Sequence, residues 1–597
     1  MTPIPRPLRL SLATALLLAL AACGESTPPP TVAATPASPV AAAPTTPRFA
    51  GTTEPFAAHP IYFVVTDRFV NGDPSNDQRD QGGEHGSFDI PLLGPDGKPF
   101  PDPEGVVDNI GYLGGDFRGI LNNADYIREM GFGAVWITPI VENPDQAFTG
   151  GDPVSPTSFL SDRGKAAYHG YWATNFYKVD EHLPSEGLDF RAFTAGMREQ
   201  GLKTVLDIVA NHGSPAWTMP SPQPQFGQLY DRDGRLIADH QNLPPDQLDP
   251  NNPLHQFYSR QKDLAQLGDF NFEHPPVLEY LTGAYLQWID QGADAFRLDT
   301  VKHVPLPVWK TLSDRIRAER PGFYLFGEAF DYSADKIAPF TWPENGGISV
   351  LDFPMKQAML KAFGQERKGF EELAPTLFLE GAPYQNVYDL TTFYDNHDVR
   401  RLDASDAGFI DAHHWLFTVR GIPVIYYGSE TGFMRGRAEH SGNRNYYGQE
   451  RIDAGRNHPI RQALVRIAGI RARSMALQRG VQVMLELEGD RAAFYRVYEG
   501  ADGAETALVL LNKGSAAAPF EIEALLQSGN WRSADGDATQ TIADGGRLTD
   551  EVPANGARVW LRQGPIELPA LIEQLNRQLS APRTSVEPPV AAAASGS

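Results

Sequence analysis

The sequence Ala-Phe-Arg-Leu-Asp at residues 295–299 is a short apolar run that ends in a carboxylate. Two later segments have the same form, Tyr-Leu-Phe-Gly-Glu at 324–328 and Phe-Tyr-Asp-Asn-His-Asp at 393–398. Runs of this length predict buried strands, and an ionisable group at the end of such a strand is costly unless it is paired or used. We therefore expect three carboxylates to meet at one end of a parallel sheet, where barrel enzymes build their sites: Asp299, Glu328 and Asp398.

Further strands and helices alternate on both sides of this region. The clearest amphipathic helices are predicted at 190–200, 277–290 and 308–317. Strands joined by helical crossovers indicate a (β/α)8 TIM barrel, with a doubly wound sheet as the alternative. The candidate strands are 61–66, 134–138, 204–209, 293–298, 324–327, 348–353, 391–394 and 423–427.

The barrel is predicted in two parts, 51–210 and 276–478. The connection between them, 211–275, is rich in Pro, Gly, Asp and Asn, which favours an inserted subdomain after strand 3. Short strands with turn signals predict a C-terminal antiparallel β domain over 479–563. Residues 564–597 combine a helix with a disordered tail, and the apolar stripe of that helix favours packing against the barrel over partner binding. The stripe comprises Leu568, Leu571, Ile572, Leu575 and Leu579.

The N-terminus has the pattern of a lipoprotein signal peptide over residues 1–22. Arg6 and Arg9 precede an apolar stretch too short to span a bilayer. Leu-Ala-Ala-Cys at 20–23 resembles a bacterial lipobox, so we expect Cys23 to be lipidated; an ordinary signal peptide is the alternative. Residues 23–50 then form a Pro/Ala/Thr-rich tether. These features predict an extracytoplasmic, lipid-anchored protein of a bacterial outer membrane.

Composition limits the partners. The 597 residues carry a net charge of -23, and Cys23 is the only cysteine, which excludes intrachain disulfides and thiolate metal sites. The negative charge disfavours nucleic acid and anionic lipid surfaces. We expect a monomer.

Five motifs, in order along the chain, resemble those of the α-amylase family, glycoside hydrolase family 13. The resemblance covers roughly residues 56–562 and implies the same barrel. The motifs are Asp-Ile-Val-Ala-Asn-His at 207–212, Leu-Gly-Asp-Phe-Asn at 267–271, Phe-Arg-Leu-Asp-Thr-Val-Lys-His at 296–303, Phe-Gly-Glu at 326–328 and Asn-His-Asp at 396–398.

The resemblance implies roles for these residues in retaining chemistry. Asp299 would be the nucleophile, and Glu328 the acid that protonates the leaving oxygen, with the two carboxyl groups about 5–5.5 Å apart. Arg297 would keep Asp299 ionised, and Asp398 would hold the distorted sugar ring. The implied substrate-binding set is completed by His397, His212, Tyr171, His169, Trp172, Lys302 and His303. Singly, an Asp–Arg pair or a buried His is more often structural; the coincidence at strand ends favours catalysis.

The loop 67–77 is dense in oxygen ligands, which suits calcium, although a plain turn-rich loop is the alternative. It resembles the calcium loop of cyclodextrin glycosyltransferases and related amylases. The implied ligands are Asn71, Asp73, Asn76, Asp77, the Gly114 backbone oxygen and Asp116. A second structural calcium would join the inserted subdomain to the barrel through Asn211, Asp269 and the His303 backbone oxygen.

The expected activity is hydrolysis of α-1,4-glucosidic bonds in starch, glycogen or maltodextrins. Lys302-His303 resembles α-amylases and cyclodextrin glycosyltransferases; the latter place a large aromatic where Ala265 stands and carry extra C-terminal domains, which favours hydrolysis. Segment 435–444 departs from the Asp-Asn-Arg that relatives use for distal sugars, so chain-length preference stays open. The alternatives are a cyclomaltodextrinase-like, neopullulanase-like or transglycosylating enzyme, a non-catalytic glucan-binding lipoprotein, and a purely structural surface protein.

Overall fold

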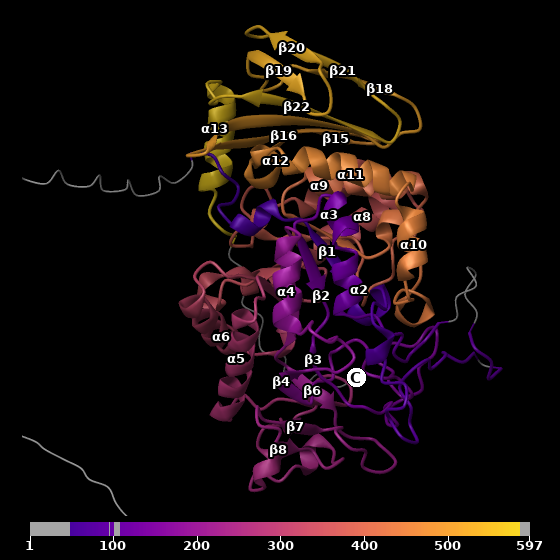
Figure 1. Ribbon diagram of the computed structural model, residues 1–597. Coiled ribbons are helices and arrows are strands. Elements are labelled where there is room, and N and C mark those ends of the chain that lie inside the picture. The colour runs from indigo at the N-terminus through magenta and orange to yellow at the C-terminus, as the bar shows by residue number, and fades with distance from the viewer. Residues whose placement is uncertain (1–47, 95, 101–107, 585–597) are drawn as a thin grey trace, which may run out of the picture. The chain divides into compact units, whose positions relative to one another are not determined.

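The computed structural model describes residues 48–94, 96–100 and 108–584 (Figure 1). The predicted signal peptide, Cys23, most of the tether and the end of the predicted tail lie outside the described residues. Within the described part of the chain, no helix is both long and apolar enough to cross a membrane.

An eight-stranded parallel sheet forms the centre of the molecule, with strand order β12-β11-β10-β5-β2-β1-β14-β13. A parallel bridge between Leu351 and Thr391 joins its two edges and closes the barrel. The predicted (β/α)8 class is therefore confirmed. The strands are β1 (Ile61–Val64), β2 (Ala134–Ile137), β5 (Lys203–Val209), β10 (Ala295–Asp299), β11 (Tyr324–Gly327), β12 (Ser349–Val350), β13 (Thr391–Thr392) and β14 (Ile422–Tyr426).

Helices flank this sheet in the pattern of a βα repeat (Figure 1). In α5, buried residues recur every three to four positions, at Val277, Leu281, Tyr285 and Trp288, which gives the helix one apolar face against the strands. The α-helices of the barrel region are α1 (Thr66–Phe69), α2 (Phe117–Asn122), α3 (Ala124–Glu129), α4 (Phe190–Glu199), α5 (Pro275–Asp290), α6 (Leu306–Glu319), α7 (Ala334–Ile337), α8 (Phe353–Phe363), α9 (Asp406–Thr418), α10 (Gly448–Gly455) and α11 (Pro459–Ala472).

The register of the central strands places polar residues side by side. Arg297 on β10 is paired with Asp207 on β5 and with Phe326 on β11. Residues paired in a parallel sheet point to the same face, so Arg297 and Asp207 share one side. Asp299, two residues beyond Arg297, lies on that side as well.

The segment after β5 forms a small subdomain of paired strands. In it, β6 (His212–Pro215) pairs with β9 (Leu267–Asp269), and β7 (Gln228–Tyr230) pairs with β8 (Leu236–Asp239). A further ribbon of β3 (Val141–Glu142) and β4 (Asn175–Val179) precedes it. The segment thus carries its own backbone pairing, with strands that its composition did not predict.

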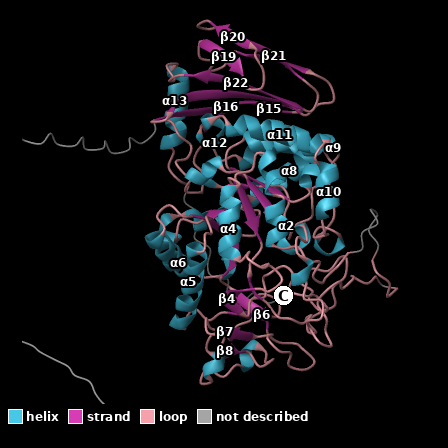
Figure 2. Cartoon of the chain, viewed as in Figure 1, coloured by secondary structure: helices cyan, strands magenta, loops and turns pink. Residues whose placement is uncertain are grey.

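The C-terminal region is an antiparallel β domain, as predicted, and its strands form a group apart from the barrel strands (Figure 2). Six strands pair in the order β15-β16-β17-β22-β19-β20, beside a separate β18-β21 ribbon. The elements are α12 (Met475–Arg479), β15 (Val481–Glu488), β16 (Arg491–Gly500), β17 (Gly503–Asn512), β18 (Ala518–Ile522), β19 (Gly529–Ser533), β20 (Thr539–Ile542), β21 (Leu548–Val552), β22 (Gly556–Gln563) and α13 (Pro569–Ser580).

The predicted helical stripe lies on α13. Leu571 and Leu575 are buried, whereas Leu579 is 44% exposed. The helix contacts β15 of the C-terminal domain, and its Arg577 pairs with Glu380 of the barrel region. It therefore joins the C-terminal domain to the barrel instead of packing on the barrel alone.

Candidate active site

One buried arginine gathers three carboxylates, one from within β5, one from the end of β10 and one directly after β11. The Arg297 Nη1 donates to Asp207 Oδ1 at 2.9 Å and to Asp299 Oδ1 at 2.7 Å. Its Nη2 lies 3.0 Å from Glu328 Oε2. The arginine side chain has no exposed surface. The structure thus brings the predicted Asp299, Glu328 and Arg297 together.

Three carboxylates around one guanidinium leave an excess of negative charge in a buried place. Burial raises the pKa of Glu328 to about 8; Arg297 opposes the shift, while Asp398 and Asp299 add to it. Burial likewise raises the pKa of Asp207 to about 7 against the attraction of Arg297. Glu328 therefore carries a proton at neutral pH, as an acid that must donate one requires.

Asp207 opens the motif at 207–212 but has no role predicted from the sequence, and the structure places it beside Arg297 in the site. Trp136 Nε1 donates to its Oδ2 at 3.0 Å, and Tyr171 Oη donates to the same oxygen at 2.8 Å. The available signal was the single acid inside the apolar run of β5, in register with Arg297. Tyr171 is anchored by this bond, and its ring stacks on His397 with centroids 5.4 Å apart.

Asp398 lies beside this group with partners of its own. His397 Nε2 is 3.1 Å from Asp398 Oδ2. Burial lowers the pKa of His397 to about 3, and that of His212 to about 4, so both imidazoles are neutral at neutral pH. The His397 contact with Asp398 is therefore made by a neutral ring. Arg444, which the sequence did not single out, pairs with Asp398 Oδ1 at 2.5 Å.

The remaining predicted binding residues lie at different depths. His169 is buried, and its Nδ1 accepts the Tyr171 backbone N–H at 3.1 Å. Trp172 is 3% exposed and belongs to an apolar cluster with Phe148 and Phe226; it backs the Tyr171 segment, and its contact with sugar stays a prediction. Two others face the loops above the strands: Lys302 Nζ donates to the Phe330 carbonyl at 3.0 Å, and His303 Nδ1 lies 2.9 Å from Asp263 Oδ2.

Most of the first predicted calcium ligands lie together. Asp116 accepts the backbone N–H groups of Gly72 and Asp73, and Asn71 Nδ2 donates to Asp77 Oδ1 at 2.7 Å. A Cβ on Gly114 would lie 2.2 Å from Asn71 Nδ2 and 2.6 Å from Asp77 Oδ1, so this backbone is pressed against the same two side chains.

Two observations test whether these residues suit a hard cation. Among the described residues, the buried side-chain oxygens of Asn71 and Asn76 have no hydrogen-bond partner, and such oxygens suit calcium. The Asp73 carboxylate instead binds the Ser75 N–H and hydroxyl, so its side chain is engaged elsewhere in this conformation.

The second predicted calcium site is also assembled from distant segments. Asn211 Nδ2 donates to Asp269 Oδ1 at 3.1 Å, and Asp263 N–H donates to Asp269 Oδ2 at 3.1 Å. His303 binds Asp263 in turn, so Asn211, Asp269 and His303 belong to one hydrogen-bonded group. Each of the three would offer an oxygen atom to the ion. A separate acidic cluster of Glu142, Asp145 and Glu181, which the sequence did not predict, has ligand atoms within 4.8 Å of one another.

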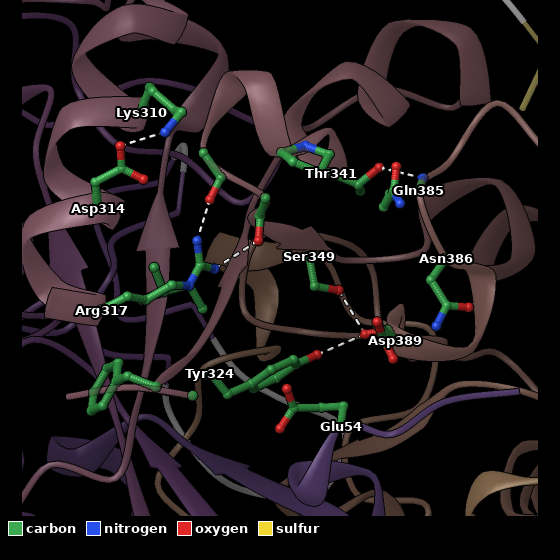
Figure 3. A pocket seen from close by; sticks show the side chains of 16 residues that line it. Glu54, Lys310, Asp314, Arg317, Tyr324, Thr341, Ser349, Gln385, Asn386 and Asp389 are labelled. Atoms are coloured by element: carbon green, nitrogen blue, oxygen red, sulfur yellow. Dashed lines mark hydrogen bonds and ion pairs between the residues drawn. The ribbon is translucent and has the colours of Figure 1, made fainter. Parts of the chain in front are cut away.

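A polar pocket lies at the opposite, amino-terminal end of the strands (Figure 3). Tyr324 and Ser349, the first residues of β11 and β12, both donate to the Asp389 carbonyl. The Arg317 guanidinium donates a hydrogen bond to the Gly347 carbonyl at 2.7 Å. These side chains are hydrogen-bonded to backbone carbonyls of the protein. We therefore interpret the pocket as structural and separate from the carboxylate cluster.

The chain matches a family model described as alpha amylase, catalytic domain, over residues 63–466. Among curated proteins it is 31% identical to a cyclomaltodextrin glucanotransferase of Geobacillus stearothermophilus over 476 residues, covering 77% of this chain and 60% of that one. A Niallia circulans protein of the same name is 30% identical over 536 residues, 85% of this chain and 67% of that one. The chain therefore spans about half to two thirds of the length of these relatives.

This chain covers nearly the whole length of two solved structures. A cyclomaltodextrin glucanotransferase described as having a three-domain ABC distribution is 29% identical, with a TM-score of 0.67, over 85% of this chain and 99% of that one. An α-amylase from Anoxybacillus is 25% identical, with a TM-score of 0.64, over 86% and 99%.

Proposed function

Because this chain belongs to the alpha-amylase family, we propose that it is a retaining hydrolase of α-1,4-glucosidic bonds in starch, glycogen or maltodextrins. The observation that carries the proposal is the Arg297 guanidinium, which holds Asp299 and Glu328 from neighbouring strands. A protonated acid beside a carboxylate is the pair that double displacement needs.

The proposed mechanism assigns a role to each charged group of the site. Arg297 binds Asp299 Oδ1, which leaves Oδ2 to attack the anomeric carbon while Glu328 protonates the departing oxygen. Glu328, now ionised, takes a proton from water, and the resulting hydroxide releases the sugar from Asp299 with net retention. Asp398 would stabilise the positive charge that develops on the ring.

Transglycosylation is the second candidate, and the comparisons favour keeping it. The curated relatives are named as glucanotransferases, and one solved glucanotransferase is described with only three domains. The number of domains therefore no longer argues for hydrolysis. Ala265 still does, since its backbone is left-handed, with φ of 48°, where a bulky aromatic is disfavoured.

Product analysis separates these candidates. The protein without signal peptide and Cys23 would be incubated with soluble starch, maltotriose and β-cyclodextrin in calcium, beside Asp299→Asn. Short α-configured maltooligosaccharides from starch, absent in the variant, would support hydrolysis. Longer products from maltotriose would favour transglycosylation, rapid cyclodextrin opening a cyclomaltodextrinase, and no turnover of any substrate would refute the proposal.

We further propose one or two structural calcium ions. The first would be held by Asn71, Asn76, Asp77, Asp116 and the Gly114 carbonyl. The second would be held by Asn211, Asp269 and the His303 carbonyl. Bound calcium would supply positive charge that couples loops to the barrel, away from the bond being cleaved.

The cellular location is also proposed from the sequence. Cys23 would anchor a monomer to the outer membrane through a lipid. Cys23→Ser should move the protein from the membrane fraction to the soluble fraction on centrifugation, and retention of the variant in the membrane fraction would contradict lipid anchoring.

A further inference from the structure

Arg444 lies buried and binds two carboxylates, those of Asp398 and Glu439. Its Nη2 is 2.5 Å from Asp398 Oδ1 and 3.1 Å from Glu439 Oε1. Its Nε donates to the His397 carbonyl at 3.0 Å. The arginine side chain is only 7% exposed. One guanidinium is therefore bound both to the Asp398 side chain and to the backbone immediately before it.

Glu439 is the second carboxylate that binds Arg444. Its Oε1 also lies 3.1 Å from His440 Nε2, and its side chain is 15% exposed. The proximity of Arg444 and His440 outweighs burial and holds the pKa of Glu439 well below its usual range. Glu439 is thus ionised and holds the same guanidinium nitrogen that binds Asp398.

We propose that Arg444, held by Glu439, is a positioning residue that fixes the Asp398 carboxylate for the transition state. This inference rests on the proposed function, in which Asp398 acts on the sugar ring. Arginine suits the task because its planar fork binds a carboxylate and a carbonyl in one fixed geometry. A lysine would supply the charge without the second bond.

The competing role for Arg444 is direct binding of a distal sugar. Both neighbouring carboxylates converge on the same Nη2 and little of the side chain is exposed, which leaves it poorly placed for that role. The two roles predict different kinetics, because misplacing a group that acts on the transition state lowers kcat, whereas losing a ground-state contact raises KM.

The test compares Arg444→Gln, Arg444→Lys and Glu439→Gln with wild type on maltotetraose. We expect Arg444→Gln to lower kcat about 30- to 100-fold, the scale of a small misplacement, with KM changed less than about 3-fold. Arg444→Lys should recover part of kcat, and Glu439→Gln should lower it about 3- to 10-fold in the same direction. Arg400→Gln is the matched control, since Arg400 is exposed and binds the Gly436 carbonyl instead of a carboxylate.

A double-mutant cycle with Asp398→Asn shows whether Arg444 acts through Asp398. Adding Arg444→Gln to Asp398→Asn should change the residual kcat less than about 3-fold. A rise in KM with kcat retained, or a full loss in the Asp398→Asn background, would overturn the inference. If Arg444→Gln does not fold, Glu439→Gln and Arg444→Lys decide by the same split. A wild type without turnover would instead refute the proposed function.

Discussion

Arg297 is bound to Asp207, Asp299 and Glu328, yet the pKa of Glu328 still rises to about 8. The physical reason is that removal of a carboxylate from water disfavours its charged form, and two neighbouring carboxylates repel a further charge. One guanidinium cannot compensate all three. Burial and the surrounding charges therefore decide that Glu328 keeps its proton and can act as the acid.

The proton on Glu328 predicts an alkaline limb in the pH profile. Because the acid must be protonated to act, kcat/KM should hold at neutral pH and fall as the pH rises through about 8. Glu328→Gln should lower kcat about 100- to 10,000-fold and remove this limb for substrates with activated leaving groups. Thermal unfolding over the same pH range serves as the control, and a limb that persists in the variant would assign it to another group.

The loop that carries the first predicted calcium ligands packs against α2 without room for side chains. A Cβ on Gly119 would lie 1.8 Å from the Val70 carbonyl oxygen, and one on Gly72 would lie 2.3 Å from the Gly119 nitrogen. Gly119→Ala should therefore cost about 3 kcal/mol or more of unfolding free energy. Gly86→Ala is the control, because nothing lies within 4 Å of its Cβ, and denaturant unfolding of both compares them. Equal stability of the two variants would contradict this packing.

Calcium removal should act on the same loop and on the contact between subdomain and barrel. At an ion concentration 100 to 1,000 times Kd, bound calcium adds about 2.7–4.1 kcal/mol per site, so a chelator should lower Tm by several degrees. Asn71→Ala and Asp269→Asn should each remove one equivalent in titration calorimetry. Glu142→Gln is the control for the separate acidic cluster, and loss of an equivalent there would relocate a site.

Across the whole molecule, α13 fastens the C-terminal domain to the barrel. Leu575 is fully buried, so Leu575→Ala should cost about 2–5 kcal/mol and lower Tm. Leu579→Ala, at the exposed position, should stay within about 0.5 kcal/mol. Since the carboxylate cluster lies at barrel strand ends, kcat at 25 °C should not change in either variant. A fall in kcat without a fall in Tm would show that the helix affects the site.

The barrel strands of the protein could be predicted from the sequence, but the predicted bounds are wrong where the strands are short. The barrel and the antiparallel domain were predicted because each strand is a local run whose pattern reflects burial, and the inserted segment was predicted from its length and its Pro, Gly, Asp and Asn content. The predicted strands 348–353 and 391–394 are only two residues long in the structure, Ser349–Val350 and Thr391–Thr392. Their apolar residues are buried as expected, but burial alone does not require a paired backbone.

The sequence alone therefore determined the barrel class and singled out Asp299, Glu328 and Asp398 as candidates, since both follow from local runs and motifs. Only the tertiary structure decided which distant side chains bind the acids of the site. Arg444 reaches Asp398 across 46 residues, and Trp136 reaches Asp207 across 71. Such pairs depend on loop paths and strand register, which are set by packing of the whole chain and leave no periodic trace in the residues themselves.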